Sequence, residues 1–152
     1  MSNARTFCKY WLPVGAWMLL IFCASSDSLS NAHSSRLIGP IVRWLAPGIS
    51  EAALERIVFR VRKCAHMVEY AVLAWLVWQA LRKPVKADPR PWRWSEFHLA
   101  LLVVTLYAVS DEFHQMFVKT RIASGWDVLI DAGGGAVSLL LVWAWGRWRK
   151  KW

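Results

Sequence analysis

The fold is decided by residues 64–81, which read CAHMVEYAVLAWLVWQAL. This run of 18 residues is mainly apolar and shows no period-two alternation, but His66, Glu69 and Gln79 interrupt it. A membrane-spanning helix needs about 20 mainly apolar residues, so this run plus its flanks is long enough to span a bilayer. The stretch therefore predicts a spanning helix that carries ionisable groups.

Three further apolar runs accompany it, and the sequence predicts four spanning helices over about 10–26, 64–81, 95–112 and 128–145. The first and third runs are short, so flanking residues must complete those helices. The composition agrees, with 57% hydrophobic residues, 12 Trp in 152 residues and a mean hydropathy of +0.30. Trp is enriched at membrane–water interfaces. We expect one all-α, polytopic membrane domain over residues 1–152.

The first apolar run has an alternative interpretation as a cleaved signal peptide. Arg5 and Lys9 form a basic n-region, and Ala24-Ser25-Ser26 offers small residues for cleavage. Cleavage would leave three spans and remove one wall of the candidate site. We therefore favour a retained first span.

The long segment between the first two runs contains two amphipathic stretches. The first follows a helical spacing from Leu37 to Leu45 and stops at Pro47-Gly48, and the second covers residues 49–61. We expect two short interfacial helices on the outer surface in this loop. An ordinary connecting loop is the alternative.

The chain has a net charge of +9, and the distribution of its Lys and Arg residues among the loops indicates an orientation in the membrane. Eleven Lys and Arg residues lie in the termini and in the loop between the second and third runs, against eight in the other two loops. The positive-inside rule then places both termini in the cytoplasm. No nucleic-acid-binding motif is present, and basic residues beside apolar runs fit anionic lipid headgroups better than nucleic acid.

The chemically versatile residues lie at the ends of the apolar runs. Four spans bring the end of run one, the start of run two, the end of run three and the start of run four to the same side. Ionisable groups are costly in a membrane and usually functional. The candidate catalytic residues are His66, Glu69, Asp111, His114 and Asp127. The candidate ligand-binding residues are Arg62, Lys63, Tyr70, Glu112, Gln115, Arg121 and Asp131.

The spacing of these residues supports a common pocket, although a purely structural polar network is the alternative. Arg62, His66 and Glu69 are four and three residues apart and share one helix face. Asp127 and Asp131 are four apart, so Asp131 lies one turn deeper. Arg62 and Lys63 could also be snorkelling interfacial charges. The glycines at 133–135 are expected to allow close helix packing.

The same residues resemble the VanZ family of small bacterial membrane proteins. The resemblance is carried by Arg62-Lys63-x-x-His66-x-x-Glu69-Tyr70, by Ser110-Asp111-Glu112-x-His114-Gln115-x-Phe117-Val118-x-x-Arg121, and by Asp127-x-x-x-Asp131-x-x-Gly134. It implies a four-span helical fold in the bacterial cytoplasmic membrane and, from the namesake of the family, a link to low-level teicoplanin resistance. This chain departs from the family pattern at Asp131, where Asn is common, and at Lys119-Thr120, where Pro-Gly is common.

Three classes of function are compatible with these residues. In the first, an enzyme acts on a lipid-linked phosphate or cell-wall precursor, with Arg side chains on the phosphate and His66 or His114 as nucleophile or acid–base group. A metal-dependent version would place Zn²⁺ or Mn²⁺ among the histidines and carboxylates. In the second, the pocket binds a lipid headgroup or a membrane partner without catalysis. Transport, which would need a homo-oligomer of so small a chain, is the third.

Overall fold

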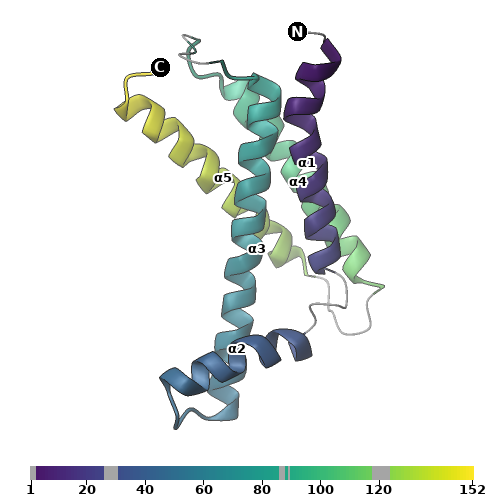
Figure 1. The fold of residues 1–152 in the computed structure, drawn as a ribbon, viewed down its shortest axis with the longest axis vertical. Helices are drawn as coiled ribbons and strands as arrows, with labels where there is room; N and C mark the ends of the chain where they lie inside the picture. The colour runs from purple at the N-terminus through teal and green to yellow at the C-terminus, as the bar shows by residue number, and fades with distance from the viewer. Residues whose placement is uncertain (1–2, 26–30, 86–87, 89, 118–123) are drawn as a thin grey trace.

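The computed structural model describes residues 3–25, 31–85, 88, 90–117 and 124–152, which form five helices (Figure 1). They are α1 (Asn3–Ser25), α2 (Asn31–Leu45), α3 (Glu51–Arg82), α4 (Trp94–Gln115) and α5 (Gly125–Trp148). Three upright helices, α1, α3 and α4, lie beside one another, and α5 diverges from α3 toward the end that carries both termini (Figure 1). The predicted all-α class is confirmed.

The central element is α3, which contacts each of the other four helices. Its buried side chains, among them Tyr70, Leu73 and Val77, form the core with Val104 of α4 and Leu139 of α5. Many large apolar side chains are exposed instead, including Leu141 at 65% and Leu106 at 60%. An apolar surface outside an apolar core is the pattern of a protein that packs against lipid.

Among the described residues, three helices are long and apolar enough to cross a membrane, namely residues 4–25 of α1 and the whole of α3 and α5. The predicted first and third runs are indeed extended by their flanks, because α1 has 23 residues and α4 has 22. Polar residues lie at both ends of α4, with Glu96 and His98 at one end and Asp111 and Glu112 at the other. These side chains lower the hydropathy of α4, which is not among the three span candidates.

One sequence prediction is wrong. Residues 49–61 do not form a separate interfacial helix, because residues 51–61 are the first turns of α3. The Ser50 side chain accepts a hydrogen bond from the Ala53 backbone N–H at 3.3 Å and caps the helix there. No Gly or Pro follows before Arg82, so nothing interrupts the helix. The helix therefore continues through the charged residues from Arg56 to Lys63 without a boundary.

The first predicted loop helix is present as α2, although the side chains of residues 31–35 lie outside the description. It crosses the lower part of α3 at a large angle (Figure 1). Arg43 of α2 and Glu51 of α3 are joined by an ion pair of 2.7 Å, which ties the two helices together around the intervening turn.

Glycine sets how closely α3 and α5 approach each other. A Cβ atom at Gly134 would lie 2.5 Å from the backbone oxygen of Met67, which is too close for any other residue. A Cβ at Gly135 would lie 3.2 Å from Val104, whereas Gly133 has nothing within 4 Å. The packing role that the sequence predicted for these glycines therefore holds for Gly134 and Gly135. Their contact fixes the N-terminal half of α5 against the polar part of α3.

Candidate functional site

Four helix segments meet at one level of the molecule, away from the two termini (Figure 1). They are the end of α1, the middle of α3, the end of α4 and the start of α5. The structure brings together most of the predicted site residues there. They form a polar cluster that comprises Ser25, Lys63, Asp111, Glu112, Gln115, Asp127 and Asp131.

Asp111 of α4 is at the centre of the polar cluster and is 3% exposed. Its Oδ2 atom accepts hydrogen bonds from Ser25 Oγ at 2.7 Å and from Gln115 Nε2 at 2.9 Å. Its Oδ1 atom and the Tyr70 hydroxyl are also buried, and neither makes a hydrogen bond to the described residues. Because an unpaired buried polar atom costs free energy, these two atoms are where a ligand atom or water would be stabilised.

Two further carboxyl groups are buried beside Asp111. Glu112 accepts a hydrogen bond of 2.9 Å from the backbone N–H of Ser124, just before α5 begins. Asp131 of α5 is 4% exposed and lies within electrostatic range of Asp111 and Glu112. The helix ends therefore enclose three acidic side chains in a small volume, which is costly unless positive charge or protons offset it.

The positive charge that faces these acids is Lys63 of α3. Its ammonium group forms an ion pair with Asp127 in the first turn of α5, and both side chains are about three-quarters buried. Lys63 also acts electrostatically on Glu112 and Asp131. The Lys63–Asp127 pair consequently links α3 to α5 at the edge of the acidic interior.

The two predicted histidines lie in different surroundings. His66 Nδ1 is 3.6 Å from Glu69 Oε2, one turn further along α3. His114 of α4 packs its ring on Phe22 of α1, with the ring centroids 4.4 Å apart. His66 thus belongs to a histidine–carboxylate pair, whereas His114 makes an aromatic contact with Phe22.

Two candidate ligand-binding residues need separate mention. Arg62 is half-buried on α3, next to Lys63, and takes part in the contacts of this region. Arg121 lies outside the described residues, so its place relative to the polar cluster stays a prediction. Within the described ranges, no three His, Cys, Asp or Glu side chains are arranged to hold a metal ion, so they provide no donor set for the Zn²⁺ or Mn²⁺ alternative.

The sequence predicted that the first span forms a wall of the site, but it did not identify the side chains of α1 that do so. Ser25 is fully buried and donates a hydrogen bond to Asp111. The Trp17 indole donates to the Glu69 backbone oxygen at 2.9 Å, and the Tyr107 hydroxyl donates to the Met18 backbone oxygen at 2.5 Å. The only signal in the sequence was the position of these polar groups on otherwise apolar stretches.

The polar cluster lies among apolar helices that are long enough to span a bilayer, which defines the chain as a small multi-helix membrane protein with a polar site between its helices. Within that class, the VanZ/LLP1 family model matches residues 10–146, and the chain belongs to this family. No curated protein and no solved structure matches the chain significantly.

Proposed function

We propose that this protein binds the phosphate of a lipid-linked envelope precursor at the outer face of the bacterial cytoplasmic membrane. The observation that carries the proposal is the ion pair between Lys63 and Asp127, which lies at the edge of a buried acidic interior. A phosphate can replace Asp127 as the partner of Lys63, because both are anions that accept charge-assisted hydrogen bonds.

The proposal includes a four-span arrangement in which α4 also crosses the membrane. Its 22 residues would extend about 33 Å at 1.5 Å per residue, enough for a hydrocarbon core of about 30 Å. With the basic termini in the cytoplasm, the polar cluster then faces the outside. α2 would lie along the outer interface, with Trp44 and Leu45 exposed toward the headgroups.

The basic residues of α3 beside the polar cluster favour an anionic ligand at its edge. Asp111 and Glu112 already accept bonds from Ser25, Gln115 and Ser124, so their oxygens are partly satisfied within the protein. Lys63 and the neighbouring Arg62 are the half-buried cations on the same part of α3. Arg is well suited to bidentate contacts with phosphate, and Arg121 is expected to add a third cation.

Binding can be measured with a polyprenyl phosphate probe and the purified full-length protein in nanodiscs. Lys63→Gln should weaken retention of the probe about tenfold, because it removes a charge-assisted contact. Lys83→Gln is the matched control, because Lys83 is an exposed lysine at the opposite end of α3. The uncharged polyprenol should bind the parent protein and Lys63→Gln equally. Equal phosphate binding by the parent protein and Lys63→Gln would end the proposal.

A hydrolase or transferase is the second candidate, and the pair of His66 and Glu69 favours it. A carboxylate can orient a histidine that exchanges protons with a phosphate ester or water. Incubation with a polyprenyl diphosphate should then release phosphate, and His66→Ala should abolish the release while leaving probe binding intact. Binding without any release from the parent protein would leave the non-catalytic function as the answer.

A consequence in cells follows from either candidate. If the protein sequesters or modifies a cell-wall precursor, its expression should change susceptibility to teicoplanin, as the family resemblance implies. Expression of Lys63→Gln at equal abundance should not change it.

A further inference from the structure

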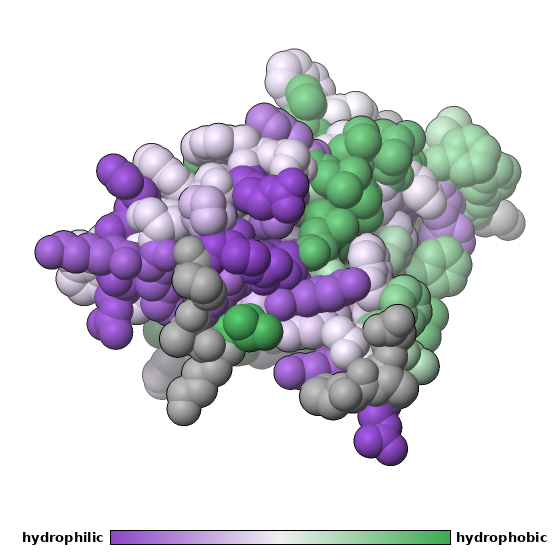
Figure 2. All heavy atoms as spheres, turned by 90° about the horizontal axis from the view of Figure 1, so that it is seen from above, coloured by the Kyte–Doolittle hydropathy of each residue, from purple (hydrophilic) through white to green (hydrophobic). Residues whose placement is uncertain are grey.

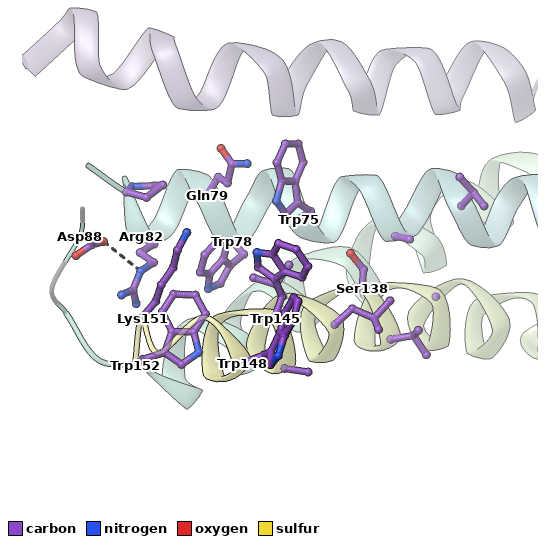
Figure 3. Close-up of a pocket in the computed structure, with 18 of the residues that line it drawn as sticks. Trp75, Trp78, Gln79, Arg82, Asp88, Ser138, Trp145, Trp148, Lys151 and Trp152 are labelled. Carbon is purple, nitrogen blue, oxygen red and sulfur yellow. Dashed lines mark ion pairs between the residues drawn. The ribbon is translucent and has the colours of Figure 1, made fainter. Parts of the chain in front are cut away.

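A second feature lies on the other half of the molecule, between α3 and α5. These helices diverge after their contact at Gly134, and a groove of about 1040 Å³ follows the gap toward the C-terminus (Figure 3). Met67 and Gly134 line its deep end, and Lys151 and Trp152 line its outer end. The groove is open to the surroundings, because Trp145 in its wall is 56% exposed.

The length of the groove matches one leaflet of a bilayer. From Gly134 to Trp148, α5 rises about 21 Å at 1.5 Å per residue. One leaflet contributes about 15 Å of hydrocarbon, and α5 is inclined to α3, so its length along the membrane normal is shorter (Figure 1). A straight apolar channel of this length fits a fatty acyl chain.

The outer end of the groove is polar and aromatic. Lys151 lines it and forms no ion pair within the described part of the chain. Arg82 also lines it, but its charge is already balanced by Asp88 at 3.3 Å and Glu96 at 3.2 Å. Trp78, only 6% exposed, lines the same stretch, and its indole N–H has no acceptor among the described residues. A lysine and an unused donor next to an apolar channel suit the phosphate and ester oxygens of a lipid.

The surrounding charge also selects an anionic occupant. The end of the molecule that carries both termini has hydrophilic residues over much of its surface, next to a hydrophobic strip (Figure 2). Basic residues follow the groove wall directly in the sequence, at Arg147, Arg149, Lys150 and Lys151. A second copy of the chain docked by this face would bring these like charges together, which is unfavourable. An anionic lipid would instead neutralise them.

We propose that the α3–α5 groove is a binding site for an anionic phospholipid, with one acyl chain between the helices and the headgroup phosphate on Lys151. Under the orientation proposed above, this lipid comes from the cytoplasmic leaflet. The site is separate from the polar cluster, which lies beyond Gly134 on the other side of the α3–α5 contact. A bound lipid would fill the groove between α3 and α5 and cover the exposed Trp75, Trp145 and Trp148.

Native mass spectrometry of the full-length protein tests this site, with phosphatidylglycerol and phosphatidylcholine of identical chains as probes. The parent protein should retain phosphatidylglycerol preferentially. Lys151→Gln should reduce that preference about fivefold, since one basic residue near an anionic surface contributes about 1 kcal/mol. Ser138→Trp should reduce retention of both lipids, because the added ring occupies the groove that Ser138 lines.

Two controls separate this proposal from the proposed function. Lys9→Gln removes an exposed charge of α1 outside the groove and should leave the preference unchanged. Lys151→Gln should bind polyprenyl phosphate as the parent protein does, because Lys151 lies in the groove and outside the polar cluster. An unaltered lipid preference in Lys151→Gln would overturn the proposal. The proposal would also be overturned if Leu141→Cys formed disulfide-linked dimers and Ser138→Trp retained lipid normally. Those two results together would mean that a second chain occupies the groove.

Discussion

Ser25 Oγ donates a hydrogen bond of 2.7 Å to Asp111 Oδ2, joining residues that are 86 positions apart. The bond connects the end of α1 to the end of α4, which are also joined by the Tyr107–Met18 hydrogen bond and the Phe22–His114 ring contact. Asp111 Oδ2 also accepts a hydrogen bond from Gln115 of its own helix, so one carboxylate oxygen has donors on both α1 and α4. The end of the first helix is therefore part of the polar cluster.

The bond between Ser25 and Asp111 predicts a stability effect. Ser25→Ala should lower the free energy of unfolding by about 1–3 kcal/mol, because a buried carboxylate loses one of its donors. Thermal unfolding in detergent measures the change. Ser110→Ala, at an exposed neighbouring serine, should stay within about 0.5 kcal/mol of the parent protein. Equal stability of both variants would show that α1 does not depend on this bond.

The contact of Gly134 with Met67 predicts a position-specific effect of alanine. Gly134→Ala should destabilise the protein by about 1–3 kcal/mol, because its Cβ atom would overlap the backbone of α3. Gly133→Ala makes the same chemical change where nothing lies within 4 Å, and should be neutral or stabilising by up to about 1 kcal/mol. Denaturant titration in micelles compares them. Similar losses in both variants would contradict the close contact.

The ion pair of Lys63 with Asp127 predicts energetic coupling between α3 and α5. Lys63→Gln and Asp127→Asn should each lower stability, and the double variant should lose less than the sum of the two. A double-mutant cycle of thermal stabilities should give a coupling of about 0.5–3 kcal/mol. Strict additivity would mean that the two side chains do not interact in the membrane environment.

A pH effect is expected in the loop before α4, outside the spanning helices. Hydrogen bonds from Arg90, at 2.7 and 2.8 Å, hold the pKa of Asp88 below its ordinary value of 3.8. A lowered pKa in the folded state means that ionised Asp88 stabilises the protein above pH 3.8. That contribution is lost as the pH falls below this value toward the lower pKa of the folded state.

Asp88→Asn tests this linkage. The variant should unfold at a lower temperature than the parent protein at pH 7, and the difference should shrink as the pH falls below about 4. Glu55→Gln is the matched control, because Glu55 is exposed on α3 and its substitution by Gln also removes one negative charge. A difference between Asp88→Asn and the parent protein that does not depend on pH would contradict the assignment.

The helical fold could be predicted because its main signals are local. Apolar runs of sufficient length specify spanning helices without knowledge of their neighbours. The start of α3 could not be predicted in the same way. The amphipathic pattern of residues 49–61 predicted a separate helix there, but a helix continues through charged residues as long as no breaker interrupts it.

The candidate site was predictable in composition but not in pairing. The number of predicted spans implied that Lys63, Asp111 and Asp127 lie on the same side of the membrane domain. The separate surroundings of His66 and His114 depend on how the helices rotate about their axes, which side-chain packing decides.

The sequence alone determined that this chain forms apolar helices with acids, bases and histidines at their ends, because hydrophobic length and residue spacing are properties of single segments. Tertiary structure decided that Ser25 binds Asp111, that Lys63 faces Asp127, and that α5 turns away from α3 after Gly134 to leave a groove. These relationships join residues on different helices, and only the packing of whole helices fixes their distances and angles.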